Sequence, residues 1–171
     1  YRVWQKSGQV LAGVILGIAM GSLFGIVYAL SRNSLPGKND VTKAVVLSGI
    51  MWVTLYLIPF LKYPANPPTV GDADTVVLRT ILYLSFIAIS GLGAFAFYKL
   101  SGKFQNNKKY LGLVGYAVFI IIVFFAMPEN PDEVTAPMNL VNEFRLVSVL
   151  GVSSFWASIG FILGLFWKKY D

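Results

Sequence analysis

Cysteine and histidine are both absent from this chain of 171 residues, and the two absences exclude several kinds of chemistry. Without cysteine no disulfide framework can form, and without thiolate or imidazole ligands the usual zinc sites are excluded. Ser-His and Cys-His catalytic pairs are excluded for the same reason. The sequence also lacks the phosphate-binding motifs G-x-x-x-x-G-K-S/T and G-x-G-x-x-G. No other nucleophile–base pair or metal triad is recognisable, so we do not expect an enzyme.

Charge is scarce as well. Charged residues make up 13% of the chain and hydrophobic residues 56%, whereas a typical soluble domain is about 25% charged. The apolar residues form long blocks with almost no polar face, although a helix of a soluble protein would have one. The net charge of +6 comes from basic residues at the ends of these blocks, which is typical of membrane orientation. We therefore expect a lipid bilayer as the surroundings and no nucleic acid partner.

Five apolar segments are each long enough to cross the hydrocarbon core as a helix, which takes about 20 residues. They run approximately over residues 8–30, 41–61, 75–98, 110–127 and 143–167. The connections are short, and no shift in composition indicates a second domain. The sequence thus predicts an all-α integral membrane protein, with residues 1–171 forming a single polytopic domain and a bundle of five transmembrane helices.

Lysine and arginine are divided unequally between the two ends of these spans. The end that carries Tyr1 holds five of the 14 basic residues, and the opposite end holds nine. Cytoplasmic loops are enriched in lysine and arginine. We therefore expect the N-terminus outside and the C-terminus in the cytoplasm. The location we expect is the plasma membrane of a prokaryote, which the chain crosses several times.

Residues 61–75, with the sequence LKYPANPPTVGDADT, interrupt the apolar pattern between the second and third spans; we call this segment the proline loop. Pro59 is expected to bend the end of the second span, and the prolines of the loop hold its backbone extended. Gly71 allows a tight turn, and Asp74 or Thr75 is placed to cap the third span. We expect a rigid loop on the outer face.

Glycine recurs every four residues in the first span, at Gly13, Gly17, Gly21 and Gly25. Four residues at about 100° each return nearly to the same face, so the ladder forms one smooth stripe, a glycine zipper. Such a stripe lets another helix approach closely, either inside the protein or from a partner. A flexing or gating helix is the alternative interpretation.

Ionisable residues inside apolar spans are costly, at about 2.5–3.5 kcal/mol each near the centre. Here Arg79, Glu143 and Arg145 all lie near the outer ends of their spans. They could be interface anchors that include a Glu–Arg pair. Alternatively, they could line a polar vestibule together with the proline loop.

Oxygen donors also gather at the outer end. The amide of Asn66 and the carboxylates of Asp72, Asp74 and Glu143 are the candidate ligands for a divalent cation, which carboxylate and amide oxygens suit. Further oxygen donors follow in the next outer loop, at Glu129, Asp132, Glu133, Asn139 and Asn142. Helix capping and solvated loop charge would explain most of these residues equally well.

Three stretches resemble the CbtA family of proposed cobalt transporter subunits. They are YALSRNSLPG (28–37), YLIPFLKYPANPPTVGDADTVVLRTILYLSFIAIS (56–90) and FRLVSVLGVSSFWASIGFILG (144–164). The resemblance implies a small polytopic membrane protein that is linked to cobalamin genes and often has a short single-span partner. Family members also carry an N-terminal helix and a His-rich, acidic external segment. Neither is present here, so we expect that they lie upstream of Tyr1 or have been lost.

Two hypotheses of function follow. In the first, the chain takes part in divalent metal uptake, with cobalt as the transported species and no resident cofactor. The four candidate ligands would then receive the ion, and Arg79 and Arg145 would hold the acids in place. In the second, the chain is a non-catalytic structural or accessory subunit of a larger membrane complex. Both hypotheses predict other membrane subunits as partners, either a small single-span protein or a larger complex.

Overall fold

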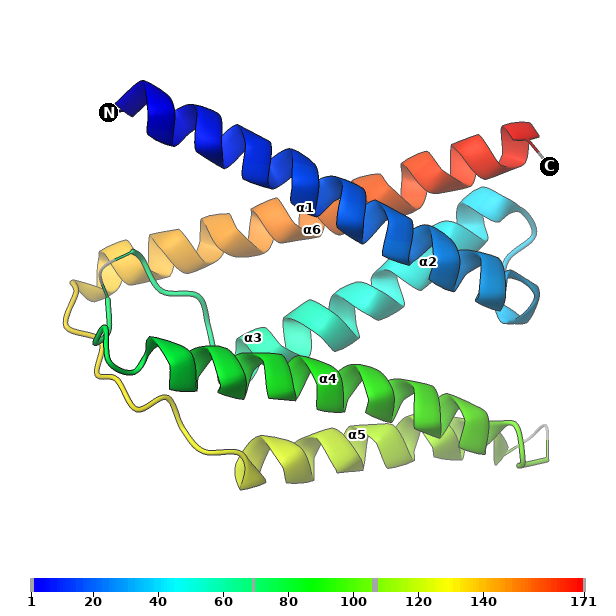
Figure 1. Ribbon diagram of the computed structural model, residues 1–171. Helices are drawn as coiled ribbons and strands as arrows, with labels where there is room; N and C mark the ends of the chain where they lie inside the picture. The colour runs from blue at the N-terminus through cyan, green and yellow to red at the C-terminus, as the bar shows by residue number, and fades with distance from the viewer. Residues whose placement is uncertain (1, 69, 106–107, 171) are drawn as a thin grey trace. The chain divides into compact units, whose positions relative to one another are not determined.

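The computed structural model describes residues 2–68, 70–105 and 108–170, and every regular element in these ranges is a helix (Figure 1). In chain order the elements are α1 (Arg2–Ser31), the 3-10 helix η1 (Arg32–Ser34), α2 (Asp40–Trp52), the π-helix η2 (Val53–Leu57), α3 (Ile58–Lys62), α4 (Val76–Ser101), α5 (Tyr110–Ala126) and α6 (Met138–Tyr170). The predicted all-α fold is confirmed.

Four stretches of helix are long and apolar enough to cross a membrane. They are Val3–Ser34, Asp40–Lys62, Val76–Ser101 and Met138–Lys169. The fourth predicted span, residues 110–127, corresponds to α5, which is apolar but shorter, with 17 residues. It ends because Met127 adopts an extended backbone, with φ of −70° and ψ of 138°. A residue that precedes a proline, here Pro128, is pushed out of the helical region.

The chain separates into two compact units, which we describe one at a time. The first unit combines the chain up to Ile50 with the segment from Ser154 onward. In it, α6 packs closely on α2, because a Cβ added to Gly164 would lie 2.6 Å from the Cα of Val41. Aromatic rings join α1 to α6: Phe24 and Trp156 meet edge to face with centroids 6.4 Å apart.

A polar cluster closes one end of this first unit. Asp40, the first residue of α2, lies 2.6 Å from the Nε atom of Arg32. The hydroxyl of Tyr28 donates a hydrogen bond to the same carboxylate at 2.8 Å, and the guanidinium of Arg32 lies over the ring of Trp167. The cluster joins the end of α1 to the start of α2, so the short connection between them has a fixed geometry.

The glycine ladder of α1 is only partly packed. A Cβ added to Gly13, Gly17 or Gly21 would meet no heavy atom of the described residues within 4 Å. At Gly25 it would meet the side chain of Leu163 of α6 at 3.7 Å. Packing along the rest of the ladder therefore stays a prediction.

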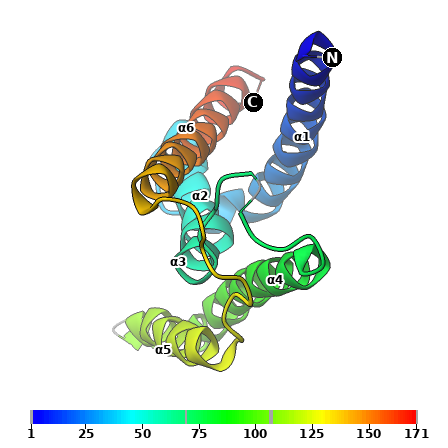
Figure 2. The same cartoon turned by 90° about the vertical axis from the view of Figure 1, so that its left-hand side faces the viewer.

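The second unit runs from Met51 to Ser153. Figures 1 and 2 both show α4 and α5 side by side, running in opposite directions. The hydroxyls of Ser90 and Tyr116 join the two helices at 2.8 Å, which satisfies two polar groups within apolar surroundings. The first residue of α4 follows the proline loop. The last residue of α5 leads into the loop of residues 127–137, which we call the second loop.

Candidate functional site

The proline loop and the second loop lie against each other. The hydroxyl of Tyr63 donates a hydrogen bond to the carbonyl oxygen of Pro128 at 2.6 Å. The ring of Tyr63 also meets that of Phe86 edge to face, with centroids 6.1 Å apart. Burial among these groups raises the pKa of the Tyr63 hydroxyl, so this group remains a hydrogen-bond donor at neutral pH.

Asp132 of the second loop is the main link between the two loops. One oxygen of its carboxylate, whose side chain is only 7% exposed, lies 2.9 Å from the Nε atom of Arg79 in the first turn of α4. The carboxylate also accepts a hydrogen bond from the backbone N–H of Asp72 at 3.1 Å. Breaking such a pair leaves an uncompensated charge, so this contact holds the proline loop in one arrangement.

Arg79 also fixes the backbone of the proline loop. Its Nη2 atom donates to the carbonyl oxygen of Asp72 at 2.8 Å. Gly71 has a φ of 98°, a conformation that favours glycine, and a Cβ there would lie 2.7 Å from the Nη1 atom of Arg79. The expected turn at Gly71 is present. The expected side-chain cap is not, because the Thr75 hydroxyl at the N-cap position of α4 is directed to Asp132 instead.

The helix that leads into the proline loop changes type just before it. The N–H of Ile58 donates to the carbonyl of Val53, five residues earlier, which is the π-helical pattern of η2. Pro59, the second residue of α3, has no N–H and would clash with the carbonyl of Leu55 in a regular α-helix. The wider π turn relieves that conflict, so the bend expected at Pro59 takes the form of a π-helical segment.

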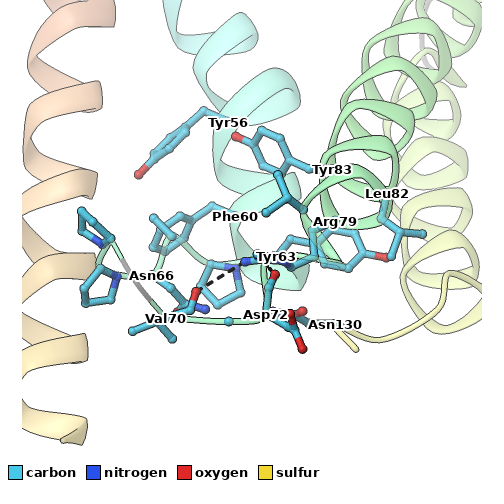
Figure 3. A pocket seen from close by; sticks show the side chains of 17 residues that line it. Tyr56, Phe60, Tyr63, Asn66, Val70, Asp72, Arg79, Leu82, Tyr83 and Asn130 are labelled. Atoms are coloured by element: carbon cyan, nitrogen blue, oxygen red, sulfur yellow. Dashed lines mark hydrogen bonds between the residues drawn. The ribbon is translucent and has the colours of Figure 1, made fainter. Parts of the chain in front are cut away.

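A pocket of about 720 Å³ lies between the proline loop, the η2–α3 segment and α4. Figure 3 shows Tyr56 and Tyr83 at one end of it, with Asp72 and Asn130 at the other end beside the loop. Its walls consist mostly of aromatic rings, prolines and aliphatic side chains. A pocket of this size and character is typical of binding sites for small solutes, in which a few polar groups determine what is accepted.

The four candidate ligands do not form one group. Asn66 and Asp72 both line the pocket, whereas Asp74 is exposed on the loop and Glu143 is exposed in the second turn of α6. One oxygen of the Asp72 carboxylate accepts the N–H of Asp74 at 3.0 Å. In the described ranges no three acidic side chains lie close enough together to hold a metal ion.

The side chains that the two supporting arginines bind are not the carboxylates of the candidate acids. The carboxylate beside Arg79 is that of Asp132, and Arg145 donates from Nη2 to the side-chain oxygen of Asn66 at 2.8 Å. Arg145 also donates from Nε to the carbonyl of Ala65 at 3.3 Å, so it ties the proline loop to α6. Nothing in the sequence distinguishes Asp132 from the other acids of the second loop, and its role becomes visible only in the fold.

Four helices that are long and apolar enough to cross a membrane define the class of this chain: it is a multi-pass membrane protein. The chain belongs to the CbtA family, described as a probable cobalt transporter subunit, which matches residues 1–168. The match confirms the resemblance seen in the sequence and does not favour the alternative of a structural scaffold. No curated protein and no solved structure matches the chain significantly.

Proposed function

We propose that this chain is a membrane subunit that takes part in the uptake of a divalent metal ion, cobalt in particular, and that it is not an enzyme. The match of the CbtA family to residues 1–168 is the observation that carries the proposal. The location we propose is the plasma membrane of a prokaryote, with the proline loop outside and the C-terminus in the cytoplasm.

The contacts of the second unit support this orientation. Tyr63 contacts Pro128, and Arg79 contacts Asp132, so the two loops lie on the same side of the bilayer. α4 leaves that side, and α5 returns to it, which supports a fifth crossing by the shorter helix. At the opposite end of this pair the chain carries four lysines, at positions 99, 103, 108 and 109. Cytoplasmic loops carry such an excess of basic residues.

The metal would meet the protein at the proline loop. The exposed carboxylate of Asp72 and the amide of Asn66 line one pocket, and Asp74 lies two residues further on. Glu143 would add a further oxygen from α6. Oxygen donors suit a hard divalent cation, but so few of them bind it weakly. Weak binding suits a transported ion, because the ion must be released again.

Other membrane subunits are the partners that we propose, in addition to the lipid bilayer. The family is described as a subunit, and a Cβ added at three of the four ladder glycines of α1 would meet no atom of the described residues within 4 Å. Another transmembrane helix could approach closely along such a stripe.

Cobalt accumulation by intact cells tests the proposed function. A strain that lacks this protein should take up less radioactive cobalt than its parent at low external concentration, and the protein supplied from a plasmid should restore uptake. Rubidium uptake in the same cells serves as the control for general membrane damage. Equal cobalt uptake by the deletion strain and the parent would refute the proposal.

A further inference from the structure

The turn between α4 and α5 gathers positive charge. Four exposed lysines lie there, and we call them the basic tip: Lys99, Lys103, Lys108 and Lys109. The sequence contains no acidic residue between Arg79 and Glu129. Within residues 2–68, 70–105 and 108–170, none of the four lysines forms an ion pair. Among these residues the charge of the tip is therefore not balanced by a carboxylate.

Close packing of α4 on α5 holds the two sides of the tip together. Gly112, the third residue of α5, is buried, and a Cβ there would lie 3.0 Å from the carbonyl oxygen of Phe97. The N–H of Lys103 donates to the carbonyl of Leu100 at 3.0 Å, so the chain turns directly after α4. The end of α4 and the start of α5 lie at the same end of the pair (Figure 1), which brings lysines from both sides of the turn together.

The position of Lys99 along α4 places it at the membrane surface. It follows Arg79 by 20 residues, which corresponds to about 30 Å of helix. The hydrocarbon core has about the same thickness. With Arg79 at the surface beside the proline loop, Lys99 reaches the opposite surface. Its Nζ atom lies 5.5 Å from the centre of the exposed Phe95 ring, one turn nearer the middle of the membrane, so the ammonium group lies against apolar surface at the level of the lipid headgroups.

The shortness of α5 brings Lys108 and Lys109 to the same level. The 17 residues of α5 span about 25 Å, less than the hydrocarbon core of about 30 Å. Where a span is too short, the bilayer thins around it and long side chains next to it extend to the headgroups. Both lysines directly precede α5. The exposed rings of Tyr98 and Tyr110 flank the turn, and aromatic residues of this kind are enriched at membrane interfaces.

We propose that the basic tip binds the phosphate headgroups of anionic phospholipids and so anchors the α4–α5 pair to one face of the membrane. An anionic phospholipid offers a negative phosphate at this depth, joined to acyl chains that can lie against Phe95. Basic residues next to a transmembrane helix attract such lipids, by about fivefold in affinity for each lysine near the surface. The inference goes beyond the metal uptake proposed above and uses from that proposal only the crossing of the membrane by α5.

A reporter of lipid contact can be placed beside the tip, because the chain has no cysteine of its own. Leu113 is exposed in the first turn of α5, and Leu113→Cys in the full chain carries a bimane fluorophore. Nanodiscs contain equal parts of phosphatidylglycerol and phosphatidylcholine, with brominated acyl chains on one lipid or on the other. Bromine quenches the fluorophore on contact, so the ratio of the two quenching signals measures the local preference for the anionic lipid. We expect a preference of at least about fivefold, and equal quenching by the two lipids overturns the inference.

Charge variants of the reporter protein test which residues are responsible. Lys99→Gln, Lys103→Gln, Lys108→Gln and Lys109→Gln together should remove the preference. Arginine at the same four positions keeps the charge and should retain it. The control removes the same charge from lysines outside the tip, with Lys38→Gln, Lys43→Gln, Lys168→Gln and Lys169→Gln together, and should leave the preference unchanged. A preference that survives the first set of changes, or is lost with arginine or in the control, refutes binding by the charge of the tip.

Soluble glycerol phosphate distinguishes a lipid site from a site for free phosphate compounds. At millimolar concentration it should leave the preference unchanged, because it lacks acyl chains and is not concentrated at the membrane surface. Loss of the preference in its presence would assign the tip to a soluble phosphate compound and overturn the lipid site. Cobalt uptake is a separate readout, since a chain without a role in cobalt uptake would still show the lipid preference, and equal quenching would leave the uptake result unaffected.

Discussion

Asp132 offers the sharpest test of what holds the proline loop in place. Asp132→Ala removes the ion pair with Arg79 at 2.9 Å and the bond from the Asp72 backbone at 3.1 Å. Breaking a fully buried pair costs about 3–5 kcal/mol. The Arg79 side chain is 25% exposed and keeps its bond to the Asp72 carbonyl at 2.8 Å, so part of that cost is recovered. We expect about 2–3 kcal/mol.

Hydrogen exchange measures this loss as local opening of the loop. At about 1.4 kcal/mol per factor of ten, exchange in a peptide covering residues 64–78 should speed up roughly 30- to 140-fold. Glu133→Ala removes an exposed carboxylate next to Asp132 and should leave the exchange unchanged. Wild-type exchange in Asp132→Ala, or the same acceleration in Glu133→Ala, would refute the reasoning.

Two further predictions concern other parts of the fold. Gly164→Ala places a Cβ 2.6 Å from the Cα of Val41, so it should cost about 1–3 kcal/mol of stability and lower the melting temperature in detergent. Gly151→Ala is the control, because a Cβ there would meet no atom of the described residues within 4 Å, and it should leave the melting temperature unchanged. Burial raises the pKa of Tyr63, so its contribution to loop closure is complete below pH 10 and is lost as the pH rises through the raised folded-state pKa. In Tyr63→Phe the backbone amides of the proline loop should exchange faster than in the wild type at pH 8, and the loss of loop closure at alkaline pH should be absent. An unchanged alkaline transition in the variant would contradict the assignment.

Much of the fold follows from local properties of the sequence. Apolar blocks of more than 20 residues predict helices, because the bilayer leaves the backbone few other ways to satisfy its hydrogen bonds. Pro128 sets the end of α5 through its effect on Met127, and the prediction missed that end by only one residue. Pro59 indicated a bend, but a helix can accommodate a proline by a kink or by a π turn, and the sequence does not decide between the two.

The site was less predictable, because its contacts join residues that are far apart in the chain. Arg79 and Asp132 are 53 positions apart, and Asn66 and Arg145 are 79 apart. Charge alone allows several acidic partners for each arginine. The choice of Asp132 depends on how the second loop folds over Thr75 and Gly71, which no local pattern in the sequence describes. The pocket likewise arises from three segments that meet only in the folded unit.

The initial rate of cobalt uptake by variants of the proline loop tests the central claim most directly. In a deletion strain that carries the gene on a plasmid, Asp72→Asn with Asp74→Asn should abolish the restored uptake at equal protein levels. Glu129→Gln with Glu133→Gln, which removes the same charge from the second loop, should leave it near the wild-type rate. Wild-type uptake by the first pair, or equal loss with both pairs, would contradict a cobalt route through the proline loop.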